Sequence, residues 1–229
     1  MAQYDGRAAQ YATSVERNPY NVYVERPAFR QLIGDVLDLR ALDAACGSGR
    51  FVSDLLARGA REVVGFDQSA DNITLARKRF PDLEFRVHDL ADPLHWLPDG
   101  RFGVVTLAMA LHYLEDRLIA LRELYRVLEP GGALVVSTRH PSEWPRHYGG
   151  GYFDEGWAED EWDDGWRLRW RRQPLDRLFD DFFQAGFTVE RVLEPRPSPQ
   201  LARLDPAAYQ RTSTHPVFIV FRLRKAAQR

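Results

Sequence analysis

The sequence contains few of the features that would set it apart from ordinary globular proteins. Its 229 residues include a single cysteine, Cys46, which excludes an internal disulfide and a thiolate zinc site and favours a reducing compartment. Lysine occurs only twice, and 31 basic residues against 33 acidic ones leave a formal net charge of -2. This balance predicts no general attraction to nucleic acid or to an anionic membrane.

Long apolar runs and targeting patterns are also lacking. The longest nearly apolar run, residues 104–111, is far shorter than the roughly 20 residues that a membrane-spanning helix needs. The N-terminus does not show the basic-then-apolar order of a secretion signal. We therefore expect a cytoplasmic protein with no membrane partner and no bound metal.

The commonest nucleotide-binding and hydrolytic motifs are missing. The dinucleotide pattern G-x-G-x-x-G fails because Val52 occupies its third glycine position. No phosphate-binding loop, nucleophile elbow or H-E-x-x-H sequence occurs. These absences disfavour nicotinamide enzymes, nucleotidases, serine hydrolases and metalloproteases.

What is present is an alternation of apolar runs and helix-like segments from about residue 28 to 137, which predicts an α/β fold with a parallel sheet. Strands are expected at 41–45, 63–66, 83–87, 102–108 and 133–137, and two more at 187–193 and 217–223. Ser69 is expected to cap a helix that Pro81 stops, and further helices are expected at about 117–128 and 174–186. Residues 194–216, with five prolines, predict a long connection.

Residues 140–173 differ from the rest in composition and predict an inserted lid. Five of the six tryptophans lie here, and residues 166–172 alternate apolar and arginine side chains as a strand with two unlike faces would. The arginines resemble a small nucleic-acid stripe, but the carboxylates at 154–164 favour a solvated face beside an acidic neighbour. The lid aromatics could line an apolar acceptor site or form a core of their own: Trp144, Tyr148, Tyr152, Phe153, Trp157, Trp162 and Trp166.

The informative motifs follow the first three strands. The turn Leu42-Asp43-Ala44-Ala45-Cys46-Gly47-Ser48-Gly49 comes at a carboxyl end, where open parallel sheets bind ligands, and its glycines allow close backbone approach. Asp67 ends the second strand, where a carboxylate can accept from both hydroxyls of a ribose. Asp89 follows the third strand and can accept from an adenine amino group. Each acid alone could be a helix cap, but three successive strand ends together predict a nucleoside pocket.

With the segments LDAACGSG, VVGFDQS, VHDL, VVTLAMALHYL and EPGG, residues 40–137 resemble the class I S-adenosylmethionine-dependent methyltransferases. The resemblance implies a Rossmann-like, seven-stranded, mostly parallel sheet with helices on both faces, an antiparallel last strand and the inserted lid. It implies one domain over 1–229, with N-terminal cap helices at 1–39, a cofactor-binding core at 40–139, the lid at 140–173, and a C-terminal helix and closing strands at 174–229.

The resemblance also assigns the cofactor site. S-adenosyl-L-methionine is the expected cofactor and S-adenosyl-L-homocysteine the product, with no metal. The turn around Asp43, Gly47 and Gly49 would follow the methionine part, Asp67 the ribose and Asp89 the adenine. Tyr11 and Tyr20 could touch the sulfonium or its carboxylate, or could pack on the sheet. The remaining expected contacts are Ala45, Cys46, Gln68, Leu90 and Ala108. Ala45 replaces the first glycine of the family motif, a change expected to be mild because a methyl group adds little bulk, and Gly103 stands where an aspartate is common.

Two histidines are candidates for a general base. His112 follows the fourth strand and His140 the fifth, so both are expected at the mouth of the pocket. His140 is the favoured candidate, because the sequence LHYL around His112 looks like the start of a helix in which the histidine satisfies local backbone groups. The sequence thus predicts transfer of a methyl group to an oxygen, nitrogen or carbon of a small, largely apolar molecule by in-line displacement. The alternatives are attack on the aminobutyrate chain of the cofactor, releasing methylthioadenosine, and a non-catalytic cofactor-binding subunit. A homodimer is left open, and a nucleic-acid substrate is the least favoured.

Overall fold

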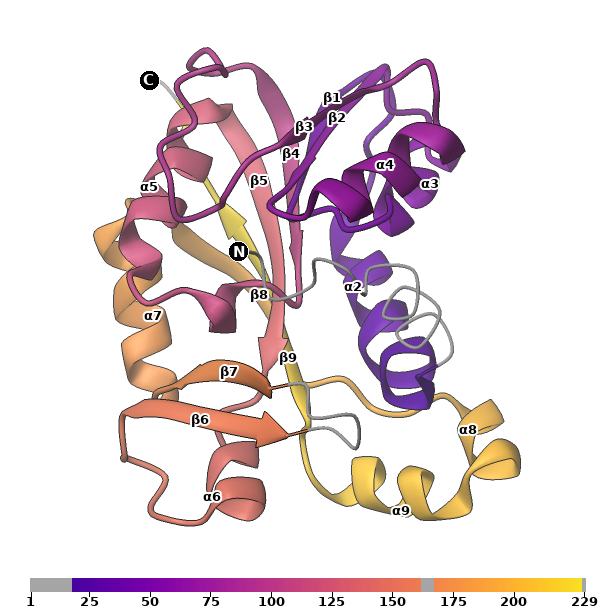
Figure 1. The fold of residues 1–229 in the computed structure, drawn as a ribbon, viewed down its shortest axis with the longest axis vertical. Helices are drawn as coiled ribbons and strands as arrows, with labels where there is room; N and C mark the ends of the chain where they lie inside the picture. The colour runs from indigo at the N-terminus through magenta and orange to yellow at the C-terminus, as the bar shows by residue number, and fades with distance from the viewer. Residues whose placement is uncertain (1–17, 162–166, 228–229) are drawn as a thin grey trace.

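The computed structural model describes residues 18–161 and 167–227, and its centre is a seven-stranded sheet (Figure 1). The strand order is β3-β2-β1-β4-β5-β9-β8. The strands are β1 (Arg40–Ala44), β2 (Glu62–Asp67), β3 (Glu84–Val87), β4 (Phe102–Ala108), β5 (Leu128–Arg139), β8 (Thr188–Leu193) and β9 (Phe218–Arg224). The first five run parallel, while β9 pairs antiparallel with both β5 and β8. The predicted Rossmann-like sheet is confirmed, including its antiparallel last strand.

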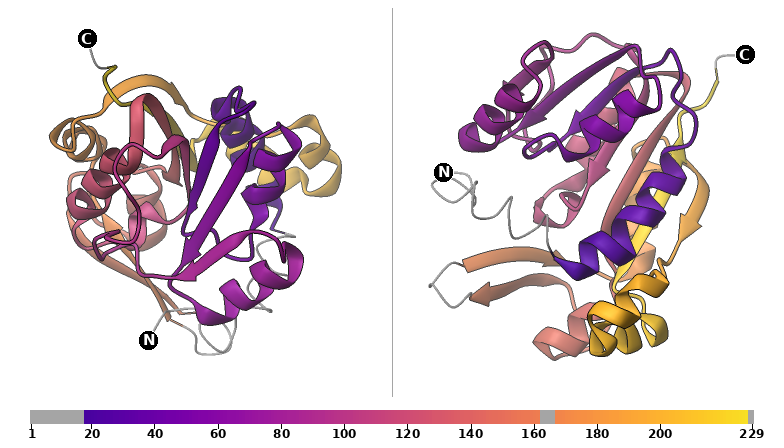
Figure 2. Two further views of the ribbon diagram at one scale, coloured as in Figure 1. Left: turned by 90° about the horizontal axis from the view of Figure 1, so that it is seen from above. Right: turned by 90° about the vertical axis from the view of Figure 1, so that its right-hand side faces the viewer.

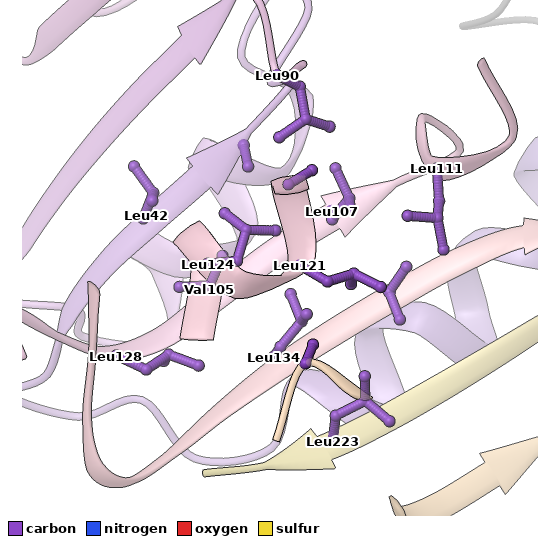
Figure 3. Packing of buried hydrophobic residues seen from close by; sticks show 14 of the residues in the cluster. Leu42, Leu90, Val105, Leu107, Leu111, Leu121, Leu124, Leu128, Leu134 and Leu223 are labelled. Carbon is purple, nitrogen blue, oxygen red and sulfur yellow. The ribbon is translucent and has the colours of Figure 1, made fainter. Parts of the chain in front are cut away.

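Helices cover both faces of this sheet because its central strands are buried on both sides (Figure 2). On one face, α2 (Arg26–Ile33), α3 (Arg50–Ala57) and α4 (Ala70–Arg79) pack through residues such as Phe29 and Ile73. On the other face, α5 (Arg117–Val127) and α7 (Leu175–Gln184) pack on a core rich in leucine (Figure 3). Leu42, Leu121 and Leu134 of that core are completely buried, each worth about 1.5–3 kcal/mol relative to exposure.

The expected helix α4 begins and ends where local signals place it. Ser69 is its N-cap, and the Ser69 Oγ accepts from the backbone N–H of Asn72 at 3.3 Å. The helix ends at Arg79, two residues before Pro81. This cap holds the start of α4 directly beside Asp67 at the end of β2.

The segment between β5 and α7 forms a separate small layer. It contains α6 (Glu143–Tyr148) and a two-stranded antiparallel sheet of β6 (Gly156–Glu161) and β7 (Arg167–Arg172). This sheet lies at the carboxyl end of β5 (Figure 1). The predicted alternation holds in β7, where Leu168 and Trp170 are buried and Arg169 is exposed, its Nε 3.0 Å from Glu159 Oε1 of β6. Trp162 and Trp166 lie outside the described residues.

The connection expected at 194–216 is not a plain loop. It contains α8 (Pro199–Leu204) and α9 (Pro206–Thr214), and each helix starts with a proline. Proline suits the first helical position, whose N–H has no partner inside the helix. Asp205 caps α9 by accepting from the N–H of Ala208 at 2.9 Å. Two of the five prolines that predicted a loop, Pro199 and Pro206, therefore mark helix starts.

Before β1, the chain forms a short π-helix, η1 (Asn21–Glu25), that runs directly into α2. Figure 1 places both beside the sheet on the side of α8. Within the described residues, the helices are all too short or too polar to cross a membrane.

Candidate functional site

A cavity of about 770 Å³ opens at the carboxyl ends of the parallel strands. Its volume lies within the range of small-molecule sites, roughly 300–1,000 Å³. Most of the residues predicted from the sequence line it: Tyr20, Asp43, Ala45, Cys46, Gly47, Asp67, Gln68, Asp89, Leu90, Ala108 and His112. Gly49 and His140 are not among the lining residues, and Tyr11 lies outside the described residues.

The turn after β1 has left-handed backbone at alternate positions. The φ angles are 52° at Ala45, 55° at Gly47 and 79° at Gly49. A Cβ on Gly47 would meet no atom within 4 Å, so this glycine leaves its space to the cavity. A Cβ on Gly49 would lie 2.9 Å from a ring carbon of Phe80, so Gly49 serves helix packing. Alanine in place of glycine at position 45 therefore costs free energy because its backbone is left-handed. The expectation of a mild effect considers only the bulk of the methyl group.

Asp67 is tied to the glycine turn and to the start of α4. Its Oδ2 accepts from the N–H of Gly47 at 2.9 Å, and its Oδ1 accepts from the N–H of Ser69 at 2.9 Å and from Asn72 Nδ2 at 3.3 Å. The residue is 7% exposed and lines the cavity. The Asp67 side chain therefore links the glycine turn to the start of α4 at the wall of the cavity.

Asp43 is buried beneath the turn. Thr106 Oγ1 donates to its Oδ1 at 2.7 Å, while its Oδ2 has no hydrogen-bond partner among the described residues. Burial raises the pKa of Asp43 from 3.8 to about 7, against the opposing effect of the Thr106 hydrogen bond. A buried acceptor that lacks a partner and lines a cavity fits a ligand group that donates hydrogen bonds or carries positive charge.

The third predicted acid, Asp89, lines the cavity just after β3. It is exposed, and its Oδ1 accepts from the N–H of Ala91 at 2.9 Å. Next to it are buried Leu90 and the ring of Phe66, whose centroid lies 5.7 Å from that of His88. Flat apolar surfaces beside a carboxylate suit a heteroaromatic ring with an exocyclic donor.

A second buried acid was missed by sequence reasoning. Glu25, the last residue of η1, lines the cavity and is 2% exposed. Ser137 Oγ, from β5, donates to its Oε1 at 2.6 Å, yet burial still raises the pKa of Glu25 from 4.5 to about 7. The contact spans 112 residues of sequence, so no local pattern marks it.

The two candidate histidines have different positions. His112 is 1% exposed and lines the cavity, with its Nδ1 3.0 Å from Thr138 Oγ1; burial and the nearby charge of Arg139 hold its pKa well below the usual value. His140 hydrogen-bonds Ser142 Oγ through Nδ1 at 2.7 Å, and its Nε2 is 3.1 Å from Glu194 Oε1 without the alignment of a hydrogen bond. Only His112 therefore faces the space a ligand would occupy.

The lid divides into a lining part and a packing part. Tyr148, Trp157 and Trp170 line the cavity, and the Trp170 ring centroid lies 5.5 Å from that of Tyr113. Trp144, 3% exposed, does not line the cavity but packs with Ala158 and with the cavity-lining Trp170 in one small core. Two further predicted aromatics lie away from the cavity lining: the Tyr152 hydroxyl accepts from the N–H of Leu175, and Phe153 is 78% exposed.

Charged side chains from α6 and α9 also line the cavity. The Glu143 Oε2 accepts from Arg211 at 2.8 Å and lies 3.1 Å from His147 Nε2, while its Oε1 has no partner among the described residues. Arg211 also lies over the ring of Tyr20, 5.9 Å from its centroid. In the part of the chain that the structure describes, no group of three or more His, Cys, Asp or Glu side chains could hold a metal ion.

Several known proteins that resemble this chain are methyltransferases. A family model described as a methyltransferase domain matches residues 42–136. A probable S-adenosylmethionine-dependent methyltransferase of Mycolicibacterium smegmatis is 36% identical over 119 residues, covering 52% of this chain and 43% of that protein. Trans-aconitate 2-methyltransferase of Rhizobium meliloti is 32% identical over 144 residues, covering 61% and 52%.

A solved structure is similar to this chain over a longer part of the fold than the sequence relatives are. An S-adenosylmethionine-dependent methyltransferase from Mesorhizobium loti superposes with a TM-score of 0.73 at 27% identity, covering 88% of this chain and 97% of that one. The chain is thus similar in sequence and in fold to S-adenosylmethionine-dependent methyltransferases. It spans about half the length of the curated relatives it matches. The matched segment ends at β5, so the lid, α8 and α9 lie beyond it.

Proposed function

We propose that this chain transfers the methyl group of S-adenosylmethionine to a small molecule with a largely apolar body. The observation that carries the proposal is the convergence of Asp43, Asp67 and Asp89 with the Gly47 turn on one cavity that continues into an aromatic chamber. The similarity to S-adenosylmethionine-dependent methyltransferases implies the cofactor, and the orphaned Asp43 Oδ2 and the open space at Gly47 fit it. The trans-aconitate enzyme among the relatives supports a small-molecule acceptor.

The donor would occupy the half of the cavity over β1 to β3. In our proposal Asp67 accepts from the ribose hydroxyls, Asp89 from the adenine amino group, and Asp43 faces the methionine part. Ala45, Cys46, Gln68, Leu90 and Ala108 provide the surrounding surface, and Tyr20 closes the side near η1. The sulfonium supplies an activated methyl group, and the buried carboxyls of Asp43 and Glu25 give this half of the cavity a negative character when ionised.

The acceptor would occupy the half over β4 and β5, beneath the lid. Tyr113, Trp157 and Trp170 offer apolar surface there and displace water from the path between nucleophile and methyl group. Alignment of the two reactants accounts for much of a rate enhancement when the nucleophile is already reactive. We propose that the lid, residues 140–173, selects the acceptor in this way.

His112 is the better placed of the two histidines to take a proton. Its low pKa keeps the imidazole neutral near pH 7, so the unprotonated form is always present, but it also makes the base weak. We therefore propose that His112 accepts a hydrogen bond from the acceptor molecule and contributes modestly to the rate enhancement. His140, outside the cavity lining, would act by holding the base of the lid through Ser142.

The products released from S-adenosylmethionine test the proposal. The protein would be incubated with the cofactor and a panel of small phenols, amines and carboxylic acids, and the products measured by mass spectrometry, with Asp67→Ala as the control. Enzyme-dependent S-adenosylhomocysteine together with a methylated acceptor supports methyl transfer. Methylthioadenosine as the main product would mean attack on the aminobutyrate chain. Tight cofactor binding without any product from the panel would favour a non-catalytic subunit.

A further inference from the structure

Arg139, the last residue of β5, lines the acceptor half of the cavity. Its guanidinium carbon lies 4.1 Å from the ring centroid of Trp170 and 6.0 Å from that of Trp144. Its Nη1 is 3.5 Å from the Tyr148 hydroxyl. The side chain is therefore half-buried and held against aromatic surface on the floor of the lid.

The charge of Arg139 is not neutralised in the part of the chain that the structure describes. Other arginines around the acceptor end have partners, since Arg169 pairs with Glu159 and Arg211 with Glu143. Arg139 forms no ion pair with any carboxylate of the described residues. Stacking on tryptophan stabilises a guanidinium without using its hydrogen-bond donors, and the long contact of Nη1 with the Tyr148 hydroxyl uses only one of the five.

An arginine in this setting is a receptor for an anion. The guanidinium presents a planar set of donors that matches a carboxylate or phosphate, and such pairs are stronger where water is partly excluded. Among the carboxylates that also line the cavity, the glutamates Glu25, Glu115 and Glu143 are not paired with Arg139; Glu143 is engaged by Arg211 and His147. A ligand anion would thus meet an available cation.

We propose that the acceptor carries an anionic substituent, a carboxylate or a phosphate, which Arg139 binds while the body of the acceptor lies between Trp170, Tyr113 and Trp157. The inference rests on the proposed function for the position of the donor. Arg139 would determine which acceptors bind and would take no part in holding the cofactor. Arg26 and Arg50, at the start of α2 and directly after the glycine turn, lie nearer the methionine end.

Matched probes test the charge requirement without any assumption about methyl transfer. The protein saturated with S-adenosylhomocysteine would be titrated with 3-phenylpropionate, its neutral amide 3-phenylpropionamide, and phenyl phosphate, with binding followed by calorimetry or by NMR. We expect the anions to bind at least about tenfold more tightly than the amide, as for a charge-assisted hydrogen bond formed away from bulk water. Tighter binding of one anion than the other distinguishes a carboxylate from a phosphate acceptor.

Three variants test whether Arg139 causes the preference for anions over the neutral amide. Arg139→Gln should bind acid and amide with similar affinity, Arg139→Lys should retain part of the preference, and Arg122→Gln, an equal charge change on the exposed side of α5, should bind like the wild type. All three should keep wild-type affinity for S-adenosylhomocysteine. Arg139→Lys retains the positive charge and serves as the folded reference if Arg139→Gln is unstable.

Several results would overturn the inference. They are equal affinity for acid and amide in the wild type, a preference that survives Arg139→Gln, and a loss of S-adenosylhomocysteine affinity in Arg139→Gln. Failure of both anions to bind below about 10 mM, a free energy near 3 kcal/mol, counts equally against it. None of these results bears on whether S-adenosylhomocysteine is formed, so the two proposals fail separately.

Discussion

Replacement of Asp67 by alanine removes three hydrogen bonds to described residues and two that are proposed. The Gly47 and Ser69 N–H groups and the Asn72 amide lose their acceptor. With cofactor bound, the ribose hydroxyls would also lose theirs. The variant therefore has an effect on the free protein and a separate effect on the complex.

The effect on binding is the larger one. A hydrogen bond to a charged group contributes about 1.5–3 kcal/mol, so two bonds from the ribose correspond to roughly 3–6 kcal/mol, or about 10² to 10⁴ in dissociation constant. Water can reach the freed N–H of Gly47, which is half-buried, but not that of Ser69, which is fully buried. We therefore expect a decrease of about 1–3 kcal/mol in the free energy of unfolding, from the Ser69 end.

Calorimetric titration with S-adenosylmethionine and S-adenosylhomocysteine measures the first quantity, and urea unfolding measures the second. Asp82→Ala is the matched control, because Asp82 is an exposed aspartate outside the cavity lining. Both ligands should be weakened equally, since ribose is common to them. Wild-type affinity in a folded Asp67→Ala protein would refute the assignment of the nucleoside site.

Three further measurements address other parts of the site. Burial raises the pKa of Asp43 to about 7, so its carboxyl is neutral below that pH and ionised above it. Calorimetry should therefore show that affinity for the cationic S-adenosylmethionine rises from pH 6 to 8 by more than affinity for S-adenosylhomocysteine does. Asp43→Asn should remove this difference in pH dependence between the two ligands. Ala45→Gly removes a left-handed alanine and should raise the free energy of unfolding by roughly 0.5–1 kcal/mol, whereas Ala57→Gly, in α3, should lower it by about 1 kcal/mol. Trp144→Ala should lower the Tm through a cavity cost of about 3–5 kcal/mol, and Trp157→Ala should raise the KM for the acceptor with the Tm nearly unchanged; the opposite pattern would exchange their roles.

The sheet and the donor half of the cavity are predictable because each residue is placed by its own strand. Asp43, Asp67 and Asp89 each sit at or just after a strand that periodicity identifies, and parallel strands bring their carboxyl ends to one edge. Only the connectivity of neighbouring strands is needed to place them together. Contacts between distant segments are not needed to predict where these three aspartates lie.

The acceptor half depends on contacts between distant segments. Glu25 meets Ser137 across 112 residues, and Glu143 meets Arg211 across 68. Both acids occur in helices whose local sequence resembles any solvated helical face, so burial could not be predicted. His140 was misplaced for a related reason: it is the first residue after β5, where the chain already turns toward α6, and its ring points to Ser142 and Glu194.

This division has a physical consequence for specificity. The donor half is built on backbone N–H groups and short aspartates fixed by the sheet, where a substitution disturbs the turn itself, as the hydrogen bonds of Asp67 show. The acceptor half is built from side chains of β5, the lid and α9, whose backbones lie beyond the cofactor turn. A change at Arg139 or Trp157 alters the charge or shape offered to the acceptor while leaving the Gly47 turn in place. Under the proposed function, single substitutions would therefore change acceptor preference at little cost in cofactor affinity, and the Arg139→Gln titrations measure that independence directly.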